Sequence, residues 1–203
     1  MTQTFAAFAA SLALALALPA PAPAGPAEDA RDLARISNYL NATETLEGNF
    51  VQVDPGGVVS EGDFYMRRPG RLRFEYAPPN PTLVIADGFW VAVIDARDGV
   101  ADRVPLSETP LYLLLKENVD LRREGAVTRI ERGDNQLAVT AGDPSGEVQG
   151  DITMVFSNNP LELRQWIVTD AEGKATTVAL RDMRANVRIE PSQFVIENAP
   201  RDN

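Results

Sequence analysis

The chain has 203 residues, with 19 basic and 29 acidic side chains, and it contains no cysteine and no histidine. Without cysteine there is no disulfide, no thiol nucleophile and no lipid-attachment site. Without histidine there is no imidazole for a catalytic triad or an ordinary zinc site. The net charge of −10 argues against a nucleic-acid partner, whose phosphates require a basic surface. We therefore expect a globular protein with no metal, no other cofactor and no nucleic-acid partner.

The first 27 residues carry no charged side chain, and residues 5–18 are an unbroken run of Phe, Ala, Leu and Ser. A run of this length is too short for a membrane-spanning helix, which needs about 20 apolar residues. It matches the apolar region of a signal peptide, and the small residues that follow resemble a cleavage site. We expect residues 1–27 to be a signal peptide cleaved at 24–27, and residues 28–203 to be one exported domain. The alternative is a buried helix or a short anchor.

The domain is predicted to begin with a helix over residues 28–40. Leu33, Ile36 and Leu40 recur at i, i+3 and i+7, while most charged side chains of this segment fall on other faces. A second, short helix is predicted over 108–118, because Pro110 occupies a first-turn position before an apolar run. Both segments are amphipathic and neither is long enough to form a layer of its own.

After residue 44 the apolar period changes to two, which predicts strands. The clearest is 71–76, where Leu72, Phe74 and Tyr76 alternate with charged residues. Turns rich in Pro, Gly and Asn separate these segments. The predicted strands cover residues 50–53, 58–67, 71–76, 82–86, 89–94, 100–106, 127–132, 135–141, 148–156, 161–170, 175–183 and 194–197.

The connections between these strands are predicted to be too short for the crossover that parallel strands require. We therefore expect about ten or eleven antiparallel strands in meander order. A twisted sheet of this width tends to curl. The predicted fold is mainly β with short helices: an incomplete, half-open antiparallel barrel closed by a helical lid.

No catalytic group emerges from the motifs. Asp95, Asp98 and Asp102 have the wrong spacing for a calcium loop and are interpreted as a solvated turn. Phosphate-binding and nucleophile-elbow motifs do not occur in the sequence. Large apolar residues remain on separate segments, and they are either ordinary core residues or the lining of a ligand cavity. These residues are Phe50, Phe64, Phe74, Trp90, Tyr112 and Trp166.

One long stretch resembles the periplasmic lipoprotein carrier family, the LolA-like proteins. The matching positions are Gly62, Phe64, Tyr65, Arg68-Pro69, Leu72, Phe74-Glu75-Tyr76 and Asp87-Gly88, followed by Thr109-Pro110-Leu111 with Leu113-Leu114. A departure is Val91-Ala92-Val93, where the family usually has a second aromatic residue after the tryptophan. The resemblance spans nearly the whole of residues 28–203.

The resemblance implies a non-enzymatic, monomeric shuttle in the periplasm. It would take acylated lipoproteins from an ABC-type release complex of the inner membrane and deliver them to an outer-membrane acceptor or to the outer membrane itself. Arg68 would hold the empty lid closed; the alternative is a surface arginine before a turn. The cavity would be lined by Phe50, Phe64, Leu72, Phe74 and Trp90. The lid would contain Leu33, Ile36, Leu40, Pro110, Leu111 and Leu114.

A second functional hypothesis remains open at this point. A half-barrel of the same shape could act as a periplasmic sensor or scaffold that binds lipoproteins or envelope proteins without shuttling them. An enzyme of lipid or glycan metabolism is disfavoured, because the chain offers no evident acid/base set.

Overall fold

The computed structural model describes residues 25–196, except 96, 98, 100 and 123–126. Nearly all of the expected signal peptide and Asp98 lie outside the described residues. Among the described residues, no helix combines the length and apolar character that crossing a membrane requires.

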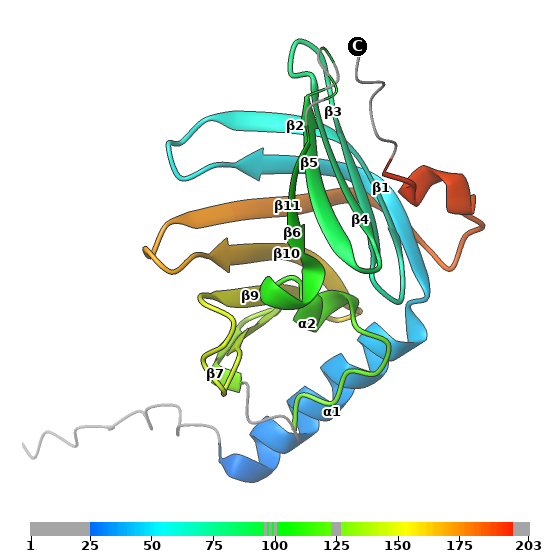
Figure 1. The fold of residues 1–203 in the computed structure, drawn as a ribbon. Helices are drawn as coiled ribbons and strands as arrows, with labels where there is room; N and C mark the ends of the chain where they lie inside the picture. Colours follow the sequence, from blue (N-terminus) through cyan, green and yellow to red (C-terminus); the bar gives the residue numbers. More distant parts are fainter. Residues whose placement is uncertain (1–24, 96, 98, 100, 123–126, 197–203) are drawn as a thin grey trace, which may run out of the picture.

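In the described part of the chain, eleven strands form a single antiparallel sheet that curls without closing, which confirms the predicted fold class (Figure 1). Their order across the sheet is β6-β5-β4-β3-β2-β1-β11-β10-β9-β8-β7. Strands β6 and β7 therefore stand at its two edges. The strands are β1 Thr45–Val53, β2 Val59–Arg67, β3 Arg71–Tyr76, β4 Thr82–Asp87, β5 Trp90–Asp95, β6 Ala101–Pro105, β7 Val127–Gly133, β8 Gln136–Gly142, β9 Asp151–Asn158, β10 Leu161–Thr169 and β11 Ala175–Ala185.

The strand order corrects the predicted simple meander. The first and last strands pair in the middle of the sheet, with Phe50 opposite Leu180. Two meanders therefore run outward from this central pair. The connection from β6 to β7 joins the two edges, and in Figure 1 its described part, up to residue 122, lies at the open side of the curved sheet. Local turn signals could not reveal this, because the central pair joins residues more than 100 positions apart.

Within the described residues, four helical segments accompany the sheet: α1 Pro26–Ala42, η1 Leu106–Glu108, α2 Tyr112–Leu115 and η2 Pro191–Phe194. The first predicted helix is confirmed. The predicted helix over 108–118 is wrong in extent, because the backbone of Lys116 is extended (ψ 157°) and ends α2 after one turn. The predicted last strand is also wrong in its described part, since η2 ends at Phe194 and no strand follows up to residue 196.

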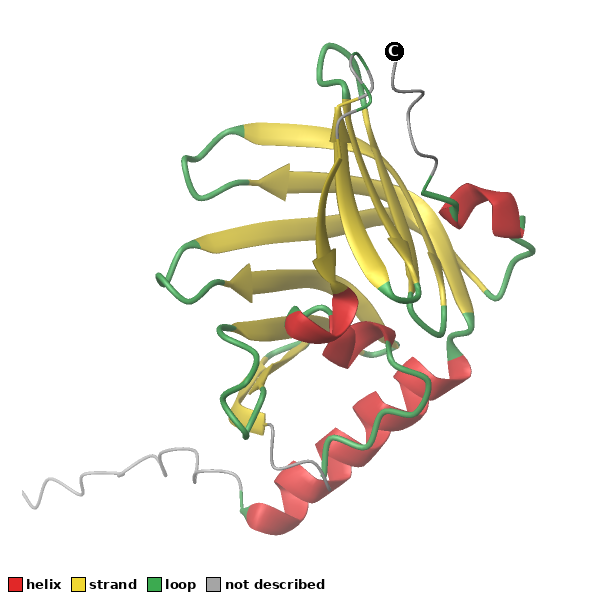
Figure 2. Cartoon of the chain, in the orientation of Figure 1, coloured by secondary structure: helices red, strands yellow, loops and turns green. Residues whose placement is uncertain are grey.

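Different helical segments lie against the two faces of the sheet. In Figure 2, α1, η1 and α2 lie together at one end of the curved sheet, and η2 lies on the opposite side, against β3 and β4. The concave face packs against α1 and α2 in the main hydrophobic core. A smaller cluster of Ile85, Ala92 and Ile94 lies apart from it, with Leu83 and Ile196 packed against it. The site described next is on the concave face.

Candidate functional site

The floor of the site is an aromatic cluster on β1, β2 and β3. Phe64 lies opposite Phe74 in the strand register, and Phe50 lies opposite Gly62. The ring of Phe74 contacts Phe50 edge-on at 4.7 Å, Phe64 at 6.1 Å and Trp166 at 5.9 Å. Such ring pairs stabilise the packing beyond the area they bury.

A glycine makes this aromatic packing possible. A Cβ at Gly62 would lie 2.0 Å from the carbonyl oxygen of Glu75 and 2.9 Å from the ring of Phe50. Any side chain at this position would therefore displace Phe50 or the neighbouring strand. Gly62 is needed for the close approach, which gives a physical reason for the small residue at this point of the strand.

Four of the five residues predicted to line the cavity are brought together here. Phe50, Phe64, Leu72 and Phe74 are all buried, with 0–6% of their surface exposed. They belong to one core cluster that also contains residues of α1 and α2. Apolar side chains of α1 and α2 pack over this floor.

Trp90 does not belong to this floor, and the prediction is corrected for this residue. It is 45% exposed. Val91 pairs with Ala86, whereas Ala92 pairs with Ile85. Ala86 belongs to the main core and Ile85 to the smaller cluster. Side chains alternate along a strand, so Trp90 shares the outer face with Ala92.

The first covering element is α1, whose apolar side is buried over the concave face. Leu33, Ile36 and Leu40 are exposed by only 9%, 0% and 1%. Burying a side chain of this size contributes about 1.5–3 kcal/mol. Apolar contacts are non-directional, so this packing does not by itself fix one position of the helix on the sheet.

The second covering element is the segment around α2. Leu114 is fully buried, and Pro110 and Leu111 are half-buried. The carbonyl oxygen of Leu115 accepts a hydrogen bond of 2.8 Å from the backbone N–H of Gly70, which ties α2 to the β2–β3 turn. All six residues predicted for the lid thus lie on the two elements that cover the sheet.

Space remains beside the α2 segment. A cavity of about 400 Å³ lies between this segment and the loop that joins β8 to β9. Leu113 and Tyr112 line it from the lid, and Pro144 and Val148 line it from the loop. This cavity separates one side of the α2 segment from the β8–β9 loop.

Arg68 joins the two covering elements. It lies in the β2–β3 turn, and its Nη1 donates to the carbonyl oxygen of Leu40 at the end of α1. Its Nη2 donates to the carbonyl oxygen of Lys116 just after α2. Longer contacts of 3.4 Å run from Nη2 to the Asn41 side-chain oxygen and to the Glu117 carbonyl oxygen.

The chemistry of a guanidinium explains this position. The last carbonyl groups of a helix lack partners within the helix and carry partial negative charge. The last turn of α1 contains no basic residue. Arg68 supplies a cation there, and its planar fork reaches both covering elements at once.

This arrangement also has an energetic cost. Burial lowers the pKa of the Arg68 guanidinium below its ordinary value. Its Nε is buried and has no hydrogen-bond partner among the described residues. The carbonyl contacts of Arg68 therefore form against a desolvation penalty.

Sequence patterns did not single out two further polar residues of α1, Asn41 and Ser37. Asn41 makes a double hydrogen bond with the backbone of Val119, with distances of 2.9 and 3.0 Å. Ser37 Oγ donates to the Leu33 carbonyl oxygen at 2.7 Å and accepts the N–H of Leu121 at 3.1 Å. Both connect α1 to the chain after α2. The available signal was a serine on the apolar side of the helix between Leu33 and Leu40.

These features define a class of protein, the open antiparallel half-barrel with an apolar concave face under helical segments. A solved structure described as a putative outer membrane lipoprotein-sorting protein domain from Vibrio parahaemolyticus has a similar fold. The TM-score is 0.50 at 8% identity, over 83% of this chain and 97% of that one.

Sequence comparison then identifies the family. The family model described as outer membrane lipoprotein carrier protein LolA matches residues 41–197 of this chain. Relatives named outer-membrane lipoprotein carrier protein include one from Halorhodospira halophila, 30% identical over 83% of this chain and 82% of its own length. Another, from Alkalilimnicola ehrlichii, is 31% identical over 83% of this chain and 80% of its own length. The chain belongs to the LolA family.

Proposed function

We propose that the protein is a periplasmic carrier that binds the acyl chains of lipoproteins and shuttles them from the inner to the outer membrane. The observation that supports this most is Arg68, which joins the ends of two covering elements over a buried apolar floor. A residue that only completed a turn would not need to contact both. Family membership supports a lipoprotein as the cargo.

The physical chemistry of such a carrier is a balance between burial and release. Each methylene group taken out of water contributes about 0.8 kcal/mol, so an acyl chain needs cover to cross an aqueous compartment. In the proposed cycle, α1 and the α2 segment move aside and the acyl chain contacts Phe50, Phe64, Leu72 and Phe74. Closure of the empty lid competes with the lipid and makes release possible.

The proposed partners follow from this cycle. The carrier would receive its cargo from an ABC-type release complex in the inner membrane and pass it to an outer-membrane acceptor or to the outer membrane itself. It would act as a monomer and by binding alone, without a catalytic residue. The expected signal peptide would direct it to the periplasm.

The experiment uses the protein without its first 27 residues and inner-membrane vesicles that contain an acylated lipoprotein. After addition of ATP, we expect a soluble complex of the two proteins to appear in the supernatant. Vesicles without ATP are the control. Binding of the lipoprotein without its removal from the membrane would instead favour the sensor or scaffold hypothesis.

A further inference from the structure

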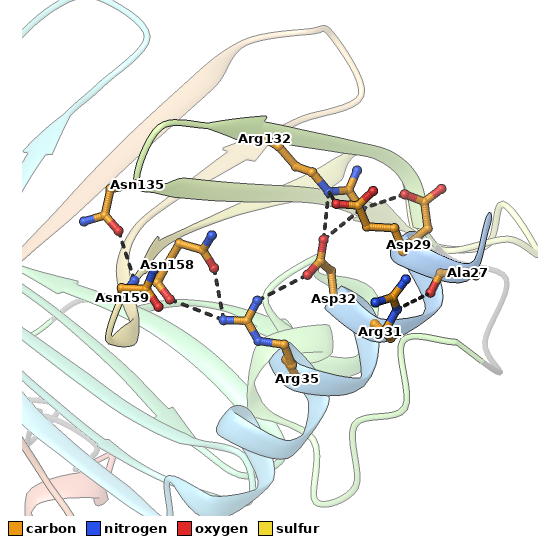
Figure 3. A network of polar contacts seen from close by, with 10 residues as sticks. Ala27, Asp29, Arg31, Asp32, Arg35, Arg132, Asn135, Asn158 and Asn159 are labelled. Atoms are coloured by element: carbon orange, nitrogen blue, oxygen red, sulfur yellow. Dashed lines mark hydrogen bonds and ion pairs between the residues drawn. The ribbon is translucent and has the colours of Figure 1, made fainter. Parts of the chain in front are cut away.

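The N-terminal half of α1 is held by another arginine, on the edge strand β7 (Figure 3). Arg132 donates from Nη2 to Asp29 Oδ1 at 2.7 Å and from Nε to Asp32 Oδ2 at 2.8 Å. Its Nε also lies 3.8 Å from Glu28 Oε1. Three carboxylates in the first two turns of α1 therefore surround one guanidinium from the sheet.

Asp32 also connects α1 to a second arginine, Arg35, and through it to β9. Asp32 Oδ1 accepts a hydrogen bond of 3.3 Å from Arg35. Arg35 in turn donates to Asn158 at its side-chain oxygen (3.0 Å) and its carbonyl oxygen (3.3 Å), at the end of β9. Figure 3 shows Asp32 between the two guanidinium groups. The N-terminal half of α1 is thus connected to β7 and to the end of β9.

The central carboxylate is removed from solvent. The Asp32 side chain is 12% exposed and that of Arg132 is 26% exposed. Burial lowers the pKa of Arg132, but hydrogen bonds to Asp29 and Asp32 outweigh it and leave the pKa above its usual value. Removing the guanidinium partner of a buried carboxylate strongly destabilises the folded arrangement, because the charge is then buried without compensation. These contacts therefore favour one position of the helix.

Strand geometry explains why Arg132 reaches α1. It pairs with Leu137, which is 2% exposed and lies in the main core. Paired residues share a face of the sheet, so Arg132 extends from the concave face at the edge of the half-barrel. In Figure 1, α1 runs from the β7 side to the start of β1. Arg68 thus contacts the C-terminal end of α1, and Arg132 contacts the N-terminal half of the same helix.

We propose that Arg132 is a second lid-positioning residue, which with Asp29 and Asp32 forms a charge clasp that keeps α1 closed in the empty protein. This inference rests on the proposed function and concerns regulation of the same site. Acyl chains can replace the apolar contacts of α1, but they offer no partner to a carboxylate. The clasp therefore contributes to the closed state alone and opposes lipid retention.

The clasp should be sensitive to salt. The Asp29 side chain is 40% exposed, so ions reach this part of the network. Raising the ionic strength from about 0.05 M to about 1 M shortens the screening length several-fold. In the native protein, salt should weaken the clasp and slow the release of bound lipid. In a variant without the guanidinium, the rate of lipid release should no longer depend on salt in this way.

The test compares Arg132→Met with Arg129→Met on the same strand. Arg129 pairs with Glu131 at 2.9 Å, and its side chain is 67% exposed, so its loss removes a charge without touching α1. The probe is a synthetic triacylated lipopeptide with a fluorescent label. We expect Arg132→Met to release the probe about tenfold more slowly at low salt, and Arg129→Met to release it at the native rate. Equal rates in all three proteins, or equal slowing in both variants, would overturn the proposal.

A second readout needs no lipid. In the empty protein, amide hydrogen exchange in residues 29–36 should be faster in Arg132→Met than in Arg129→Met, and unchanged exchange would refute the clasp. If the native protein does not bind the lipopeptide, the proposed function fails, while the exchange measurement still decides on the clasp. If Arg132→Met does not fold, Arg132→Lys replaces it. Lysine keeps the charge but lacks the fork that joins two carboxylates, so exchange should still rise.

Discussion

Replacing Arg68 by leucine should strengthen lipid binding and slow lipid transfer. The substitution keeps an apolar stem but removes the donors to the carbonyl oxygens of Leu40 and Lys116. The empty closed lid then loses contacts that the lipid-bound open form does not have. Lipid binding competes with a less stable closed state, so the apparent dissociation constant should fall.

The contacts of Arg68 set the magnitude. A hydrogen bond from a charged donor contributes about 1.5–3 kcal/mol, and Arg68 donates to the carbonyl oxygens of Leu40 and Lys116. The desolvated Nε offsets part of this sum. A net loss of about 1.5–3 kcal/mol for the closed lid corresponds to about tenfold to hundredfold tighter lipid binding.

The assay measures binding and transfer of a labelled triacylated lipopeptide to acceptor vesicles. Arg67→Leu is the matched control, because Arg67 is the adjacent arginine, which ends β2 and lies opposite Thr45 and Arg71 in the sheet. We expect Arg68→Leu to bind more tightly and transfer more slowly, and Arg67→Leu to behave like the native protein. Native affinity and native transfer rate in Arg68→Leu would refute the role assigned to it.

Three further predictions concern the floor, the lid and pH. Phe74→Ala should lower the free energy of unfolding by about 3–5 kcal/mol through the cavity it leaves, as measured by urea denaturation; a loss below about 1 kcal/mol would contradict the packing described. Ser37→Ala should leave the buried N–H of Leu121 without its acceptor and cost about 1–3 kcal/mol, with faster amide exchange at Leu121; unchanged exchange would show that the hydrogen bond is unimportant. Hydrogen bonds, first from Ser145, lower the pKa of Asp143 from 3.8 to about 2. Its contribution to stability is present above pH 3.8 and lost as the pH falls toward 2, and an NMR titration midpoint at its usual value would disprove this.

Local patterns were sufficient for most of the strands, though not for the one predicted over 194–197, and for much of the floor. The alternation of Leu72 and Phe74 with charged residues indicated the buried face, and both residues are buried on it. Trp90 was placed in the cavity through the family resemblance, whereas the register of β5 with β4 puts its side chain on the opposite face. Pairing with the neighbouring strand therefore decides the face that a strand residue occupies.

Local sequence patterns do not predict contacts between residues far apart in the chain. The pairing of β1 with β11 and the contact of Arg132 with Asp29 both join residues more than 100 positions apart. Nothing in the order of residues specifies such partners until the sheet has curled. Arg68 was identified through family resemblance, since a lone arginine before a proline carries no structural signal of its own.

The most direct test of the central claim is to locate a bound acyl chain. A lipopeptide with a photoreactive group near the end of one acyl chain is mixed with the protein, irradiated and mapped by mass spectrometry. We expect adducts on the concave floor, at Phe50, Phe74 or their neighbours in the main core. Adducts confined to the outer face around Trp90 would contradict binding on the concave face.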